Sequence, residues 1–351
     1  MHRLFIALIL LSLTYGSHAA EVDNLYQASA PVSSRDEQER AALMPQLLQQ
    51  VMLKVVGNRA ILESAPLAPV LSDADRYMQQ YEYRRTNIIG ADLTQPDELS
   101  LTLRFDPAAV NRAVNELQLP VWGSNRPDIL LWAVVDNSGE ASILGLESAP
   151  MGVFRPLSQA ADQRGLPVLM PLMDLQDQQA IDLSDIRDGN WSVIETASER
   201  YGADVILTAV IGLSGDEVKV QWRADGAGVS DRWQSQGDMQ HAFDTGIGHL
   251  ADNLALQFGQ LVDHGGEAQR LTMQIKDVLN YADFSRLMAY LEKLELITDI
   301  RVINLGERQL DLDIAFRGSF DVLQRTFDVG KLLIEEPKSD GNDAKQYRLI
   351  P

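Results

Sequence analysis

The polar residues best suited to binding lie in an acidic segment near the middle of the chain. Its carboxylates are Asp174, Asp177, Asp182, Asp185 and Asp188. They follow an apolar run at residues 166–172, which predicts a buried strand, and ligands of open α/β sheets bind where such strands end. Carboxylates with this spacing could contact a partner or hold calcium, although a helix–loop–helix calcium loop is not matched. A solvated loop is the plainer interpretation, and all three stay open.

Two tryptophans form the second candidate site. Trp222 and Trp233 lie on the neighbouring predicted strands 218–223 and 232–236, among polar residues. Such a pair could form an exposed aromatic surface for a protein or a glycan. The alternative that we favour buries one face of the pair beneath the amphipathic helix that follows. We keep both tryptophans, together with the acidic segment, as candidate partner-binding residues.

No catalytic motif stands out in the sequence. The histidines beyond the first twenty residues are His241, His249 and His264, and none has a recognisable nucleophile context. His241 and His249 are eight residues apart, so on one helix they are too distant along the axis to share a metal ion. We therefore expect no catalytic residue, no metal site and no cofactor. A carboxylate-based hydrolase is the enzymatic alternative.

The amino-acid composition excludes several kinds of site and of binding partner. The 351 residues include no cysteine, which excludes disulfides, thiolate zinc sites and the lipid-bearing cysteine of a bacterial lipoprotein. The formal charge of -20 gives the chain no electrostatic basis for binding nucleic acid or anionic lipid. No later stretch reaches the roughly 18 apolar residues of a membrane helix. We expect no transmembrane segment and no lipid anchor.

The first residues have the three-part layout of a secretory signal peptide. Met1-His2-Arg3 is a short basic start, residues 4–13 form an apolar core, and Ser17-His18-Ala19 places small residues where a signal peptidase reads. We expect cleavage after Ala19, which makes 1–19 a signal peptide. The mature protein is then expected in the periplasm.

Three units are expected to position these residues. They are an N-terminal α+β domain at 20–120, a central α/β domain at 121–265 and a C-terminal domain at 266–351. Proline and glycine mark both boundaries, at Pro120 and at Gly265-Gly266. The fold class is thus multidomain, α/β and α+β.

Local patterns in the N-terminal unit predict its elements. A capping box at Ser34–Glu37 starts a helix that carries Pro45 and ends at Gly57. A further helix is predicted at 73–83. Strands follow near 84–92 and at 98–105, where apolar residues alternate with polar ones.

The other two units differ in their patterns. Ile129–Val135 is a continuous apolar run, typical of a strand buried on both faces. Similar runs at 166–172 and 205–211 alternate with helices, which predicts a central α/β domain with a mixed sheet. From residue 271 to 334 the expected order is β-α-β-β-α-β, that of a ferredoxin-like domain.

Five segments together resemble a known family of exported bacterial proteins. They are "LYQASAPV", "VVGNR", "RPDILLWAVVD", "RGLPVLMPLMDLQDQQAI" and "ASERYGADVILTAVI". The family is known only as domain of unknown function twenty sixty-six, and the resemblance spans about residues 22 to 335. It implies a Gram-negative source and export, and it supplies no catalytic residue.

The central unit also looks like the anticodon-binding-like α/β domain of envelope proteins. Those proteins include curli-secretion proteins, the translocation protein of the Tol system and lipoprotein activators of penicillin-binding proteins. The shared feature is the passage "RYGADVILTAVI" from helix to strand. Likeness of this kind concerns the fold and supports function only weakly.

These patterns predict a non-enzymatic periplasmic protein that binds other cell-envelope components. The expected partners are envelope proteins, not yet identified, and no nucleic acid. A periplasmic solute- or glycan-binding protein is the first alternative. Such a protein would need a deep cleft between units.

Overall fold

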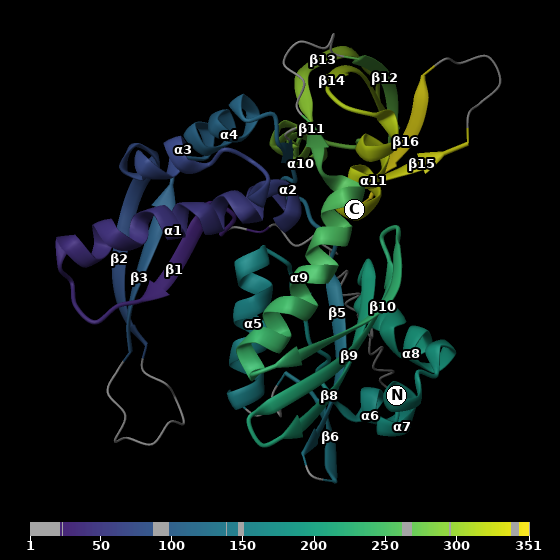
Figure 1. The fold of residues 1–351 in the computed structure, drawn as a ribbon. Helices are drawn as coiled ribbons and strands as arrows, with labels where there is room; N and C mark the ends of the chain where they lie inside the picture. Colours follow the sequence, from purple (N-terminus) through teal and green to yellow (C-terminus); the bar gives the residue numbers. More distant parts are fainter. Residues whose placement is uncertain are drawn as a thin grey trace, which may run out of the picture.

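The computed structural model describes residues 22, 24–86, 98–137, 139–146, 151–261, 269–294, 296–337 and 344–350. Over these residues the protein has the predicted multidomain α/β fold, with mixed and antiparallel sheets (Figure 1). The predicted signal peptide and the linker at Gly265-Gly266 lie outside the described residues.

In the N-terminal unit one long helix packs on an antiparallel sheet of order β1-β3-β2. The strands are β1 (Gln27–Pro31), β2 (Met78–Thr86) and β3 (Glu98–Phe105). The helices are α1 (Glu37–Val56), α2 (Arg59–Glu63), α3 (Ala68–Ser72), η1 (Ala74–Tyr77) and α4 (Pro107–Glu116). Leu101, Leu103 and Phe105 alternate along β3 and are fully buried, in one core with the apolar stripe of α1.

Helix α1 ends as predicted but begins differently. Gly57 takes a left-handed φ of 77° and its N–H donates to the Leu53 carbonyl, which confirms the expected C-cap. The predicted capping box is wrong, because Asp36 is the N-cap and the Ser34 hydroxyl donates to Glu39 at 2.8 Å. Pro45 lies inside a helix that continues through it.

The predicted helix at 73–83 is wrong over most of its length. Only the single turn η1 forms, and β2 begins at Met78. Tyr81 and Tyr83 alternate with polar residues, and Tyr83 lies opposite Leu101 of β3. Pairing with β3 therefore decides the conformation of this segment. The last part of the predicted strand near 84–92 lies outside the described residues.

The central unit has the predicted mixed sheet, of order β10-β9-β8-β5-β6, with β7 also paired to β5. Strands β7 and β8 are parallel to β5, and the other neighbours are antiparallel. The strands are β5 (Ile129–Asn137), β6 (Glu140–Leu144), β7 (Val168–Leu169), β8 (Val205–Ser214), β9 (Glu217–Gly226) and β10 (Val229–Gly237).

Helices cover both faces of this sheet (Figure 1). The helices are α5 (Met151–Arg164), α6 (Leu175–Ala180), α7 (Leu183–Asp188), α8 (Trp191–Ser198), η2 (Glu199–Tyr201) and α9 (Met239–Phe258). Leu131 and Ala133 of β5 share a core with α5 and α9, whereas Trp132 and Val134 share one with α7 and α8. The continuous apolar run of β5 is thus buried on both faces, as predicted.

The predicted buried strand at 166–172 is mostly wrong. Only β7 forms, and Leu169 and Leu172 are 43% and 49% exposed. β7 pairs with β5 at Ile129 and Leu130 alone, while β6 pairs with the same strand from Ala133 onward. The chain therefore leaves the sheet after Leu169.

The C-terminal unit has the predicted β-α-β-β-α-β order, followed by one more strand. Its elements are β12 (Gln269–Lys276), α10 (Tyr281–Lys293), β13 (Ile297–Leu305), β14 (Gln309–Phe316), α11 (Phe320–Gly330), β15 (Leu333–Glu336) and β16 (Lys345–Leu349). The sheet order is β13-β14-β12-β16-β15. Strand β16 runs parallel to β12 and lies between β12 and β15.

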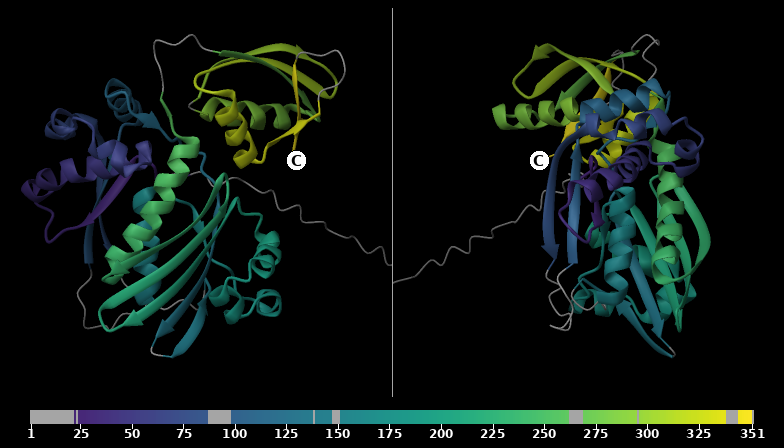
Figure 2. Two further views of the ribbon diagram at one scale, coloured as in Figure 1. Left: turned by 45° about the vertical axis from the view of Figure 1, so that its right-hand side comes forward. Right: turned by 60° about the vertical axis from the view of Figure 1, so that its left-hand side comes forward.

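Buried cations join the units. The Arg126 guanidinium, 0% exposed, donates hydrogen bonds to main-chain carbonyls of both the N-terminal and the central unit. The acceptors are the carbonyls of Lys54, Trp122, Gly123, Arg164 and Gly165. Two short strands, β4 (Pro120–Val121) and β11 (Gln260–Leu261), also pair at this junction. Figure 2 shows the N-terminal unit beside α5 and α9.

Among the described residues no helix has the length and apolar character needed to cross a membrane.

Candidate functional site

The acidic segment forms two short helices, α6 and α7, where a loop was predicted. Asp174 is the N-cap of α6, and its carboxylate accepts from the N–H groups of Gln176 and Asp177. It also forms a two-pronged ion pair with Arg200, at 2.8 and 2.9 Å. Hydrogen bonding from Arg200 lowers the pKa of Asp174 to about 2.

Asp177 is fully buried, so the interpretation of a solvated segment fails for it, whereas Asp174, Asp182 and Asp188 are exposed. One carboxylate oxygen accepts from the Arg200 guanidinium at 2.9 Å. The other accepts from the Met173 N–H at 2.9 Å and from the Tyr201 hydroxyl at 2.5 Å. Burial, and then the hydrogen bond to Asp177, raise the pKa of Tyr201 to about 12. Asp177 therefore connects α6 to η2, which follows α8, and cannot reach a partner.

The other three carboxylates do not join this cluster. Asp185 accepts from the Asp182 N–H at 2.9 Å and from the Asn190 side-chain amide at 2.9 Å. It therefore contacts the residue before α7 and a residue just after it. Asp188 is exposed at the last residue of α7. Within the described ranges, no group of three or more His, Asp or Glu side chains is placed to hold a metal ion.

The tryptophan pair is covered by α9. Trp222 is 2% exposed and stacks on Trp233, with ring centroids 6.1 Å apart and planes 9° apart. The indole N–H of Trp222 donates to Ser235 at 2.8 Å, and that of Trp233 donates to the Gly246 carbonyl in α9 at 3.0 Å. The hypothesis of an exposed aromatic surface is therefore wrong. The favoured alternative, burial beneath the following helix, is confirmed.

The histidines of α9 lie apart from each other. His249 Nε2 lies 2.7 Å from Asp231 Oδ2, and the His249 ring packs on Trp233 with centroids 4.8 Å apart. Its hydrogen bond to His249 lowers the pKa of Asp231. His241 is exposed, and His264 lies outside the described residues.

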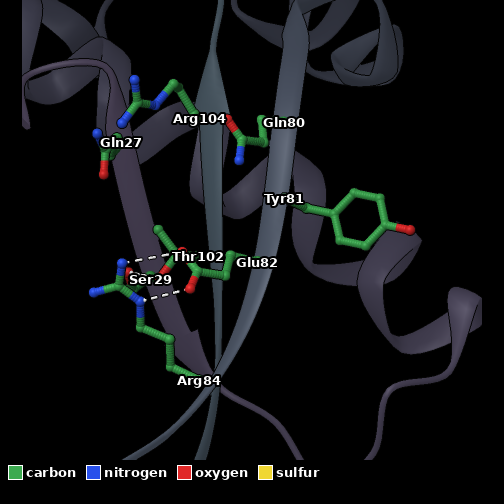
Figure 3. A pocket seen from close by; sticks show the side chains of 8 residues that line it. All are labelled: Gln27, Ser29, Gln80, Tyr81, Glu82, Arg84, Thr102 and Arg104. Carbon is green, nitrogen blue, oxygen red and sulfur yellow. Dashed lines mark hydrogen bonds and ion pairs between the residues drawn. The ribbon is translucent and has the colours of Figure 1, made fainter.

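A shallow hollow of about 180 Å³ lies on the open face of the N-terminal sheet (Figure 3). Its lining residues are Gln27, Ser29, Gln80, Tyr81, Glu82, Arg84, Thr102 and Arg104. All come from β1, β3 and β2, and every one except Tyr81 has its side chain on the face opposite α1. Figure 3 shows the Tyr81 ring pointing away from the polar side chains, and the Arg40 guanidinium lies 4.3 Å from that ring.

The polar side chains of the hollow form two rows across the three strands. Ser29, Thr102 and Glu82 are in register, and so are Gln27, Arg104 and Gln80. The Ser29 and Thr102 hydroxyls are 2.8 Å apart. Adjacent strands place these side chains about 5 Å apart, so the rows are set by the sheet.

The hollow is locally basic on an acidic chain. Arg84 pairs with Glu82 through two contacts of 3.0 Å, and this pairing lowers the pKa of Glu82. The Arg104 guanidinium has no hydrogen-bond or ion-pair partner among the described residues. With two arginines and one glutamate the lining carries a formal charge of +1, against -20 for the whole chain.

Sequence reasoning missed this site, although a signal for it was present. The alternation of apolar and polar residues along 98–105 places Thr102 and Arg104 on the face away from the core. Because a helix was predicted at 73–83, the matching residues of β2, Gln80 and Glu82, were not assigned to this face.

Comparison with known proteins places the hollow in a family-matched segment. A family model described as "Domain of unknown function (DUF8605)" matches residues 19–123, less than half of the chain. No curated protein matches the chain. Among solved structures it is similar to the Thermus thermophilus Protein Y N-terminal domain, with 8% identity over 37% of this chain and 93% of that chain. The TM-score of 0.17 is too low to indicate a shared fold.

Proposed function

We propose that this chain is a non-enzymatic, exported protein that binds another protein of the cell envelope through the hollow of its N-terminal sheet. The observation that carries the proposal is the pair of polar rows on β1, β3 and β2. Seven polar side chains there line an open face, and the Arg104 guanidinium has no hydrogen-bond or ion-pair partner among the described residues.

The size of the hollow favours a macromolecular partner. Sites that enclose small molecules typically measure about 300–1,000 Å³. At about 180 Å³ this hollow holds a few side chains of a partner and does not enclose a solute. The solute-binding alternative is therefore less well supported.

The charge of the hollow favours a partner segment that carries carboxylates. Arg84 is held by Glu82, so Arg104 is the cation available for a new ion pair. Guanidinium groups bind carboxylates through two parallel hydrogen bonds. The amides of Gln27 and Gln80 flank Arg104 in the same row and can donate to the same group.

Export rests on residues 1–19 and on the resemblance to the exported family twenty sixty-six. The anticodon-binding-like character of the central unit belongs to the same proposal, because envelope proteins reuse that domain.

Cell fractionation and N-terminal sequencing test export. We expect mature protein that starts at Ala20 in the periplasmic fraction. Recovery of protein that starts at Met1 contradicts it.

Binding is tested with a photo-crosslinking amino acid placed at Thr102 in living cells. A matched probe at Gln234, exposed on β10 of the central unit, is the control. We expect one discrete adduct from Thr102 that Gln234 does not give and that Arg104→Glu removes. Adducts of equal yield from both positions, or an adduct indifferent to Arg104→Glu, contradict the proposal.

A further inference from the structure

Strand β13 exposes apolar side chains at the edge of the C-terminal sheet. Val302, Ile303 and Leu305 are 48%, 58% and 61% exposed. Among the described residues β13 pairs with β14 alone, and it lies at the opposite edge of the sheet from β15 (Figure 1). Its outer edge therefore presents main-chain N–H and C=O groups beside apolar side chains, which is a template for another strand.

The charges of β13 select one way of pairing. Asp299 and Arg301 lie two residues apart, and the Arg301 Nε is 2.9 Å from Asp299 Oδ2. Both side chains are about half exposed. If two copies of β13 pair antiparallel about a two-fold axis at Ile300, Asp299 of each copy lies opposite Arg301 of the other. Opposite charges directly across a strand pair are stabilising, and like charges are destabilising.

Shifting the two-fold axis by one residue would make the charge pairing destabilising. A two-fold axis at Arg301 would place the two arginines directly opposite each other. The axis at Ile300 lies within residues 299–302, the stretch of β13 that pairs regularly with β14 between irregularities after Ile297 and after Val302. Charge therefore favours the register about Ile300.

We propose that β13 is a homodimer interface, in which two copies of this chain join their C-terminal sheets antiparallel about Ile300. The interface is isologous, as a two-fold axis requires. It uses none of the residues of the hollow, so it goes beyond the proposed function and is independent of it.

Charge reversal tests the register directly, with the full mature chain and its mass measured by light scattering after size exclusion. The native protein is expected at twice the monomer mass. Asp299→Arg alone and Arg301→Asp alone should each raise the dissociation constant roughly tenfold or more, because each makes like charges face. The double variant D299R/R301D should dimerise again, and so should an equimolar mixture of the two single variants.

Two further variants separate the interface from a folding defect. Ile303→Lys places a charge at the apolar edge and should give monomer with an unchanged circular dichroism spectrum. Leu256→Glu, on a side chain 63% exposed on α9, is the control and should leave the dimer intact. Arg104→Glu should also leave it intact. A native protein that is monomeric at all concentrations, or single reversals that the mixture does not rescue, overturns the proposal.

Discussion

The ammonium of Lys331, at the end of α11, lies 3.1 Å from Oδ1 of Asp204 in the central unit. Asp128 Oδ2 is 3.8 Å from the same nitrogen, and burial raises the pKa of Asp204. Lys331 adopts a left-handed φ of 50°, where glycine is favoured. A lysine that accepts this backbone conformation places its side chain across the boundary between two units.

Lys331→Glu should separate the C-terminal unit from the central unit. The new carboxylate would face Asp128 and Asp204, so an attraction becomes a repulsion among partly buried charges. Small-angle X-ray scattering should report a larger radius of gyration than for the native chain. Lys293→Glu, at the exposed end of α10, is the control, and an equal expansion in both variants would argue against this contact.

Asp177→Asn should destabilise the central unit. The change removes one of the two carboxylate charges that pair with Arg200 and weakens the acceptor of the Tyr201 hydroxyl, at a cost of about 2–3 kcal/mol. Urea unfolding monitored by tryptophan fluorescence measures the loss. Asp188→Asn, on the exposed end of α7, should stay within about 0.5 kcal/mol of the native chain. Equal stabilities of the two variants would show that Asp177 has no structural role.

Lys54 should make the stability depend on pH in a defined window. Burial lowers the pKa of Lys54 to about 8, from 10.5 in the unfolded chain. Between these values the unfolded chain binds more protons, so the free energy of unfolding contributed by Lys54 rises with pH. From pH 7.5 to 9.5 the native chain should gain about 1–2 kcal/mol relative to Lys54→Met. Parallel pH profiles for the two proteins would contradict a lowered pKa.

Gly246→Ala should disturb the packing of α9 on the tryptophan pair. A Cβ at this position would lie 2.3 Å from the Trp222 indole, so the helix must shift. Overpacking of this kind costs about 1–3 kcal/mol. Gly152→Ala, in α5 with nothing within 4 Å of the added carbon, is the matched control and should be neutral or slightly stabilising. Urea denaturation of both variants measures the difference.

Local sequence predicts the elements here better than it predicts their contacts. The buried run of β5 and the β-α-β-β-α-β order were predictable, because each rests on a pattern within a short segment. The burial of Asp177 was not, since its partners Arg200 and Tyr201 come more than twenty residues later. The hollow depends on three strands whose order follows from pairing, and one of them has the local sequence of a helix.

The buried guanidinium of Arg126 makes the N-terminal unit depend on residues of the central unit. Its acceptors include carbonyls at Lys54 and at Gly165. The N-terminal unit therefore cannot complete this hydrogen-bond set until the chain has been made as far as Gly165. The family-matched segment ends at residue 123, before Arg126, so a polypeptide cut there would leave the Lys54 carbonyl without this donor. The N-terminal unit and the start of the central unit are thus expected to fold as one cooperative unit.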